Sequence, residues 1–538
     1  MKSLGPKGAA SMANKRCLQP VSVVVSFLFL FIFSFCQVTF GHAVLIEANP
    51  PLNSQVEESP AEIRYVFNER LEKRLFYIRV FNEHGELMTD DQAQMSEDQR
   101  EVSLELPLLP NGTYTVTYHI VSADGHPVEQ SGYLTVGSSS QQPSSWYMLN
   151  VVNQQNHEGV SIDRMLYYAA LLFLTGWLFW GIFFSFQEET NEATYRQWLQ
   201  RFRHFFLFSL LITGGLQLSS LLRDWGIASL IPELSKSLWG WTWLISLLLA
   251  ASAYWILRKT KWIDALWILL LLVIEGLVGH AITFSPAFLT VFIDIIHLVV
   301  ATVWVGGLWF FIVFWKSARR EMIRFYPLFS QAALISILVA TGSGLLLTFL
   351  FIPKWSYLIK TVWGILLIVK TALVLAVVLV AQSVRTKMKL NQVDQLERLL
   401  RIDFSLMIAI VIIVGALTYV NPLPQNKPLY WNEKRPSVHL MTQITPKAPG
   451  DNQISVHAKM VQADREVKLV EVSLVNRDGK VAPIQVPVEP IDSEVEEIGD
   501  AFRAQGPYLP FAGNWTIEVR VRDSNDDEKM YKKDFTVY

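Results

Sequence analysis

Three side chains near the start of the chain are of the types that bind a transition metal. Cleavage after Gly41, at a site with the small residues of a signal-peptidase motif, would make His42 the first residue. A terminal histidine offers its α-amine and an imidazole nitrogen in one chelate ring. Asp124 and His126 are two residues apart, so on an extended segment they project to the same side. Together these groups form a tetragonal N/O set, which suits Cu(II), the divalent ion with the highest affinity for such sites.

A second interpretation of these residues stays open, in which Asp124 caps a turn and His42 is an unbound terminus. The segment before His42 has a basic start and an apolar run, Val21–Phe35, as an export signal does. We therefore predict a signal peptide at residues 1–41, with an uncleaved anchor helix as the alternative. Cys17 and Cys36 lie within it, so the mature chain would have neither a disulfide nor a thiolate ligand.

Four ionisable residues fall inside long apolar stretches, where such residues are costly and mark functional sites. They are Glu275, His280, Asp294 and His297. Asp294 and His297 are three apart and share a helix face, whereas Glu275 and His280 are five apart and do not. We predict that the two histidines form a receiving site for an ion, with the two carboxylates holding charge nearby. The alternative is that the histidines serve as hydrogen-bonding contacts between helices.

The other polar groups of the chain are predicted to be structural. Lys370 would compensate a carboxylate inside the membrane, and His204 would lie at the membrane interface. His84 would be a solvated turn residue and His119 a strand residue.

Eight apolar stretches must position the membrane residues, each near the roughly 20 residues that cross a bilayer as a helix. They lie at 164–186, 204–222, 238–257, 262–283, 290–315, 327–352, 361–384 and 403–420. Alternate connecting loops carry 15 Lys and Arg in one set and 4 in the other, which places the first set in the cytoplasm. An even number of spans then leaves both termini outside, in agreement with an export signal.

Polar sequence on either side of these stretches alternates with period two and is interrupted by turn residues, which indicates β domains. We predict a multi-domain membrane protein: a β domain at 42–137, a linker at 138–162, an eight-helix bundle at 163–421, a linker at 422–437 and an all-β sandwich at 438–538. Its surroundings are the lipid bilayer of the plasma membrane, with both β domains extracellular. The net charge of −2 gives no indication of a nucleic-acid partner.

The first domain resembles the CopC family of bacterial copper carriers through four segments: His42–Leu45, Asn49–Pro51, Phe67–Glu69 and Ser122–Val128. The resemblance implies a cupredoxin-like all-β barrel and Cu(II) held by His42, Asp124 and His126. The methionine-rich Cu(I) loop of some members is missing, since Met88 and Met95 are isolated.

The membrane part is similar to the CopD copper-resistance family at Gly279–Ala281, His297–Leu308 and Val369–Leu373. That family implies eight spans and a role in copper uptake. The last domain resembles the YtkA-like β domain at Gly506–Trp515. In this domain His439 and Met441 share a strand face, whereas His457 and Met460 do not, so an ordinary sandwich surface is favoured over metal binding.

These patterns favour a copper importer that is not an enzyme and has neither catalytic residues nor a bound cofactor besides copper. It would capture Cu(II) outside, with an extracellular copper-handling protein as a candidate partner, and pass it to the bundle. No nucleotide-binding motif indicates a power source. Two alternatives stay open: a haem-binding membrane oxidoreductase that reduces Cu(II), and a copper-sensing or buffering surface protein.

Overall fold

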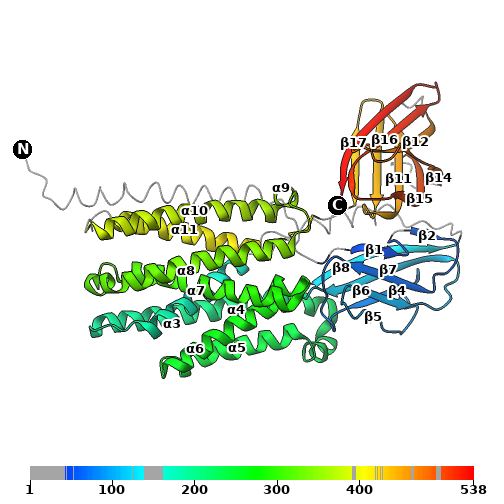
Figure 1. Ribbon diagram of the computed structural model, residues 1–538. Helices are drawn as coiled ribbons and strands as arrows, with labels where there is room; N and C mark the ends of the chain where they lie inside the picture. The colour runs from blue at the N-terminus through cyan, green and yellow to red at the C-terminus, as the bar shows by residue number, and fades with distance from the viewer. Residues whose placement is uncertain are drawn as a thin grey trace, which may run out of the picture. The chain divides into compact units, whose positions relative to one another are not determined.

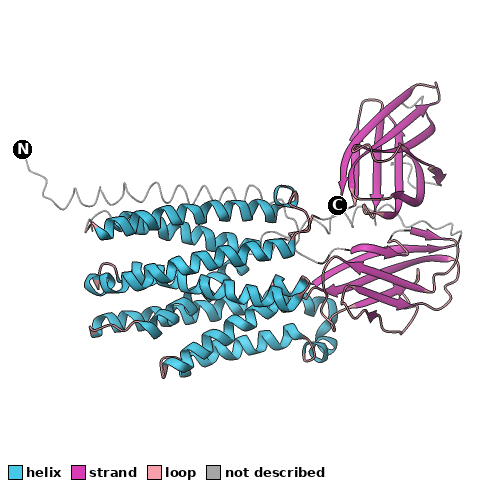
Figure 2. Ribbon diagram, in the orientation of Figure 1, coloured by secondary structure: helices cyan, strands magenta, loops and turns pink. Residues whose placement is uncertain are grey.

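The structure is a computed structural model of the chain. It describes residues 43–137 except 44, 53, 124 and 126, residues 162–390, and residues 396–538 except 419, 421, 425, 427, 462–465 and 492–498; the side chains of 220, 223–226, 228, 229, 280 and 451 are also left undescribed. These ranges contain a β domain, a helical unit and a second β domain (Figure 1 and Figure 2). The predicted signal peptide and nearly all of the predicted linker 138–162 lie outside the described residues.

The first β domain contains two four-stranded sheets, with strand orders β1-β3-β6-β5 and β2-β8-β7-β4. Its strands are β1 (Leu45–Asn49), β2 (Ser54–Val56), β3 (Glu62–Phe67), β4 (Tyr77–Phe81), β5 (Gln94–Met95), β6 (Glu101–Glu105), β7 (Gly112–Val121) and β8 (Pro127–Val136). The prediction that this part of the chain forms β structure is therefore confirmed.

The two sheets share one hydrophobic core because their strands alternate buried and more exposed residues. In β3 the buried positions are Ile63, Tyr65 and Phe67. Tyr65 and Phe67 pack edge-on against Tyr118 of β7, with ring centroids 5.3 and 5.5 Å apart. The domain is thus a sandwich of two sheets. No strand pair among its described residues joins the sheets, so the predicted closed barrel is not confirmed.

The helical unit is built from long helices joined by short connections. They are α3 (Ile162–Phe183), α4 (Glu189–Leu234), α5 (Leu238–Ile256), α6 (Lys261–Val278), α7 (Ala287–Phe314), α8 (Arg319–Phe351), α10 (Val362–Lys389) and α11 (Leu396–Leu417). Two short segments, η1 (His280–Thr283) and α9 (Tyr357–Lys360), lie between them.

Each predicted span overlaps one of these long helices, but not all of the helices are long and apolar enough to count as candidate membrane spans. Within the described ranges, α3, α5, α7, α8, α10 and α11 are long and apolar enough to cross a membrane. Helices α4 and α6 are not among them, and α6 carries Lys261, Asp264 and Glu275 within 18 residues. Several membrane spans are therefore present, and their number, eight, stays a prediction.

Helix α4 differs most from the sequence prediction, because it includes most of the charged segment 187–203 that was predicted as a loop. Tyr195, Leu199 and Phe202 recur there at helical spacing, and all three are buried. Charged residues occupy the opposite face of this amphipathic stretch. The charge that suggested a loop therefore belongs to the exposed face of a helix.

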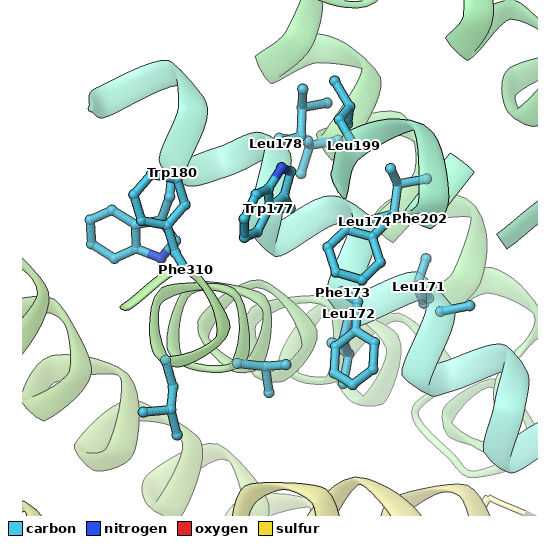
Figure 3. Packing of buried hydrophobic residues seen from close by; sticks show 14 of the residues in the cluster. Leu171, Leu172, Phe173, Leu174, Trp177, Leu178, Trp180, Leu199, Phe202 and Phe310 are labelled. Carbon is cyan, nitrogen blue, oxygen red and sulfur yellow. The ribbon is translucent and has the colours of Figure 1, made fainter. Parts of the chain in front are cut away.

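Helix α3 lies at the centre of the helical unit, packed against α4, α6, α7 and α11. Four consecutive residues, Leu171–Leu174, are buried, as in a helix surrounded on all sides. Figure 3 shows Trp177 of α3 with Phe202 of α4 and Phe310 of α7 in this core. The Trp177 ring lies 5.5 Å from Phe202 and 5.2 Å from Phe310, measured between centroids.

A glycine pair determines how closely α3 and α7 approach. A Cβ atom added to Gly306 of α7 would lie 2.3 Å from the Cα atom of Gly176 of α3. Small residues allow membrane helices to pack backbone against backbone in this way. The crossing fixes the position of α7, which carries Asp294 and His297.

The second β domain also contains two sheets around one core, with strand orders β14-β15-β11-β10-β9 and β13-β12-β16-β17. Its strands are β9 (Leu429–Lys434), β10 (Val438–Thr445), β11 (Gly450–Met460), β12 (Val467–Asn476), β13 (Ile484–Val486), β14 (Glu489–Ile491), β15 (Asp500–Leu509), β16 (Gly513–Asp523) and β17 (Glu528–Val537). Strand β9 falls in the segment 422–437 predicted as a linker. It pairs with β10, so the domain begins earlier than predicted.

Candidate metal centre

The loop that carries Asp124 and His126 joins β7 to β8. The last paired residues are Val121 and Pro127, and Gly125 between them has φ +87°, a conformation suited to glycine. His42, Asp124 and His126 themselves lie outside the described residues. The predicted Cu(II) ligands therefore stay a prediction, and only their surroundings can be examined.

The segment after β3 connects the start of β1 with this loop. Leu45, at the beginning of β1, pairs with Phe67 at the end of β3. A few residues later Leu71 bridges to Ser122, and the Glu72 amide donates to the Val121 carbonyl at 2.7 Å. The described residues that flank the predicted ligands in sequence thus meet at one end of the domain.

Two buried carboxylates lie in this segment, and the sequence prediction assigned them no role. Glu69 is 4% exposed and Glu72 is 7% exposed. Glutamates are almost never fully buried unless they are paired, so their burial marks this end of the domain as polar inside. Phe67–Glu69 was one of the segments that carried the resemblance to CopC. The alternation of polar and apolar residues could not predict that Glu69 is buried.

In the helical unit, His297 of α7 contacts Ser343 of α8. The Nδ1 atom of His297 lies 2.9 Å from the Ser343 hydroxyl oxygen. The Ser343 hydroxyl also lies 2.8 Å from the Val339 carbonyl oxygen of its own helix. In the tautomer in which His297 donates to Ser343 from Nδ1, the lone pair of the ring is on Nε2, where it can bind a metal ion.

Three charged groups from three helices surround this contact. Asp294 of α7 interacts electrostatically with Glu275 of α6 and with Lys370 of α10, and Lys370 also interacts with His297. An Oδ2 atom of Asp294 lies 3.6 Å from where a Cβ atom of Gly279 would be. Glu275 and Asp294 thus belong to one electrostatic cluster with Lys370, which links them to His297. The side chain of His280 lies outside the described part of the chain, and its backbone begins η1.

Glu275 also faces a small cavity that the sequence did not predict. The Tyr167 hydroxyl of α3 donates to the Glu275 Oε2 atom at 2.7 Å. Both side chains line a cavity of about 70 Å³ between α3, α4, α5 and α6, with Arg164, Thr213 and Trp243 also on its wall. The Trp243 Nε1 and Thr213 Oγ1 atoms are buried and have no hydrogen-bond partner among the described residues. Such groups are normally satisfied by ordered water, and a cavity of this size has room for it.

Three further histidines, His84, His119 and His204, lie outside this cluster. His84 is exposed in the turn after β4, and His204 lies beside Tyr254 on α4 and α5. His119 is fully buried in β7 and stacks on Tyr77 at 5.3 Å between centroids. Burial, together with the Arg79 guanidinium, lowers the pKa of His119 to about 4. Across the described ranges, no group of three or more His, Cys, Asp or Glu side chains could hold a metal ion.

Comparison with known proteins identifies two parts of the chain. Residues 45–137 match the CopC domain, and residues 323–417 match copper resistance protein D. The copper transport protein CutJ of Bacillus subtilis is 25% identical over 94% of this chain and 98% of its own length. The chain belongs to the CopC–CopD family of copper resistance and transport proteins. It is accordingly a multi-pass membrane protein.

Other relatives of this CopC–CopD chain match its first domain. Protein YobA of Escherichia coli is 34% identical over 16% of the chain and 72% of its own length. The solved CopC from Methylosinus trichosporium OB3b is 28% identical, covering 19% of this chain and 100% of that one, with a TM-score of 0.17. PcoC, a methionine rich copper resistance protein from Escherichia coli, is 25% identical, covering 18% and 98%, with a TM-score of 0.16.

The match to copper resistance protein D includes α8, α10 and α11, and therefore Ser343 and Lys370. Glu275, His280, Asp294 and His297 precede the matched residues. Their grouping with Ser343 and Lys370 thus comes from the packing of α6 and α7 and not from the family match.

Proposed function

We propose that this protein imports copper across the plasma membrane. Its first domain captures Cu(II) through His42, Asp124 and His126, and the helical unit accepts the ion at His280 and His297. The observation that carries the proposal is the electrostatic cluster in which Lys370 links Glu275 and Asp294 to His297, inside a membrane unit that follows a CopC domain.

Capture by the first domain is supported by the way its strands meet. The start of β1 and the loop between β7 and β8 both adjoin the segment that follows β3. A cleaved amino terminus and a loop carboxylate and imidazole can therefore approach one another. An amine, two imidazoles and a carboxylate suit Cu(II), and burial of Glu69 places a further negative group near that end.

Acceptance by the helical unit is supported by the hydrogen bond between His297 and Ser343. A histidine that binds a metal normally donates its other ring N–H to a fixed partner. Here the Ser343 hydroxyl is the partner of Nδ1, and Nε2 is the nitrogen that we propose as the ligand. A copper ion inside the bilayer needs such ligands to replace its water, and Asp294 and Glu275 supply negative charge against the Lys370 ammonium.

Copper accumulation in cells tests this proposal. Cells without their own copper uptake would express the parent chain, His297→Ala, His280→Ala or His204→Ala, and copper would be measured after an EDTA wash that strips the surface. His204 is the matched control, because it lies on a helix of the same unit away from this cluster. We expect accumulation by the parent and by His204→Ala, and background levels for the other two variants.

Two results would contradict the proposal. Accumulation at the parental rate by both His280→Ala and His297→Ala, with each protein present in the membrane, would make these histidines contacts between helices. Copper that is removed completely by the EDTA wash from cells expressing the parent would favour a buffering or sensing protein. A visible absorption spectrum of the purified protein gives a further check: we expect no haem band, and a band would favour the oxidoreductase.

The orientation that import requires has both β domains outside the cell. It is supported by the 15 Lys and Arg in one set of connections against 4 in the other. Protease added to intact protoplasts should remove both domains. Protection of either domain would contradict this orientation.

A further inference from the structure

One face of the five-stranded sheet in the second β domain brings together two histidines and a methionine. Met441 of β10 pairs directly with His457 of β11. His439, two residues before Met441 on β10, lies on the same face, since side chains alternate along a strand. The sequence alone grouped His439 with Met441. The register of β10 and β11 adds His457, which comes from a separate strand.

The spacing of these three positions suits one small ion. Directly opposed residues have Cβ atoms about 4.5–5.5 Å apart, and diagonal neighbours are about 7–8 Å apart. His439 pairs with Lys459, two residues from His457, so His439 and His457 are diagonal neighbours. An ion above the centre of this triangle lies within reach of two imidazoles and one thioether.

Met441 and His457 each show a feature that fits a bound ion. Met441 is 41% exposed although it is a large hydrophobic residue. The Nδ1 atom of His457 is buried and has no hydrogen-bond partner among the described residues. A buried ring nitrogen without a protein partner is destabilising unless another group satisfies it, and a metal ion on this face would do so. Met460, by contrast, packs into the core on the opposite face.

The ligand types and the nearby positive charge decide which ion the site prefers. His439 pairs with Lys434 on β9, and Met441 pairs with Asn432. His457 pairs with Ala501 on β15 and interacts electrostatically with Arg503 of that strand. Repulsion by a positive side chain penalises a divalent ion about twice as much as a monovalent one at the same place. A thioether with two imidazoles is a soft ligand set, which selects Cu(I).

We propose that His439, Met441 and His457 form a Cu(I)-binding site on the outer face of this sheet. The site is separate from the predicted Cu(II) ligands of the first domain and from the histidines of the helical unit. It gives the second β domain a ligand of its own, and it does not depend on import by the helical unit.

Methionine methyl resonances of the full-length protein in detergent test the proposal. The protein would carry ¹³C-methyl methionine, with Met441→Leu and Met530→Leu assigning the two signals. Met530 is the matched control, because it is 42% exposed on β17 of the other sheet in the same domain. Cu(I) would be titrated under anaerobic, reducing conditions, and Zn(II) in a parallel series. We expect Cu(I) to shift the Met441 signal with saturation at one ion for this site, and the Met530 signal to stay in place.

The histidine ligands are tested by His457→Asn, with the unshifted methionine signals reporting that the domain is folded. Loss of one of three ligands should weaken the Cu(I) effect on Met441 by about tenfold or more, since losing even an outer-shell partner costs 10–100-fold. If that variant does not fold, His439→Asn serves as the second test. A Met441 signal that does not move with Cu(I), that moves together with Met530, or that responds equally to Zn(II) would overturn the proposal.

Discussion

The Nδ1 atom of His297 on α7 and the hydroxyl oxygen of Ser343 on α8 lie 2.9 Å apart. In the proposed receiving site this hydrogen bond orients the imidazole so that Nε2 is the ligand nitrogen. Replacing Ser343 by alanine removes this partner and leaves the ring without it. We expect Ser343→Ala to lower copper accumulation by about 10–100-fold, the usual cost of losing an outer-shell partner.

Thr341→Ala is the control for that substitution. Thr341 lies on the same helix and its hydroxyl bonds only to the Ile337 carbonyl of that helix. Uptake by Thr341→Ala should match that of the parent. Equal uptake by Ser343→Ala and Thr341→Ala would show that the hydrogen bond between Ser343 and His297 does not contribute to uptake.

The crossing of α3 and α7 gives a prediction on stability. Gly306→Ala would place a methyl group 2.3 Å from backbone atoms of Gly176, which cannot move aside without separating the helices. We expect a loss of about 1–3 kcal/mol in stability, as for overpacked cores. Gly342→Ala on α8 meets no atom within 4 Å and should stabilise its helix by roughly 0.5–1 kcal/mol.

Thermal unfolding of the purified protein in detergent measures both changes. The predicted order of midpoints is Gly342→Ala, parent and Gly306→Ala, from highest to lowest. A midpoint for Gly306→Ala at or above that of the parent would contradict the close crossing.

The first β domain should lose stability in acid because of His119. Burial lowers the pKa of this imidazole to about 4, below the unfolded value near 6.5. The unfolded chain therefore binds a proton that the folded domain excludes between these pH values, so stability falls as the pH drops from about 6.5 to about 4. The full shift corresponds to roughly 3 kcal/mol.

Amide hydrogen exchange of β7 in the full-length protein, corrected for the intrinsic effect of pH, reports this dependence. His119→Phe should flatten the profile between pH 4 and 6.5, while His84→Gln, at an exposed position, should leave it unchanged. A steep profile in His119→Phe would assign the acid sensitivity to other groups.

The proposed amino-terminal chelate predicts a strong effect of one added residue. Insertion of an alanine before His42 moves the α-amine away from the imidazole and breaks the chelate ring. We expect Cu(II) affinity to fall by more than about 100-fold, since outer-shell losses alone cost 10–100-fold. Competition titration followed by electron paramagnetic resonance measures it, with His84→Ala as the control. Unchanged affinity in the extended protein would remove His42 from the site.

The sequence predicted the membrane helices and many strands because each reflects a local pattern. Apolar runs of bilayer length correspond to α3, α5, α7, α8, α10 and α11. Alternation of polar and apolar residues corresponds to strands such as β3 and β7. The prediction of a loop at 187–203 was wrong because it relied on the local charge of the segment. Its charges suggested a loop, whereas the spacing of Tyr195, Leu199 and Phe202 made it part of α4.

Contacts between distant residues could not be predicted in this way. The pairing of Met441 with His457 depends on the register of β10 and β11, and the bond between His297 and Ser343 depends on α7 packing on α8. Both are set by tertiary packing, which a single sequence does not reveal. Sequence spacing did place Asp294 and His297 on one face, but not Tyr167 beside Glu275.

Uptake of radioactive copper by sealed membrane vesicles tests the central claim most directly. Right-side-out and inside-out vesicles would be prepared from cells expressing the parent chain or His297→Ala, and internal copper would be followed over time. The proposal predicts time-dependent accumulation only in right-side-out vesicles with the parent chain, and none with His297→Ala. Accumulation only in inside-out vesicles would mean export, and equal accumulation with His297→Ala would contradict the proposed route through the bilayer.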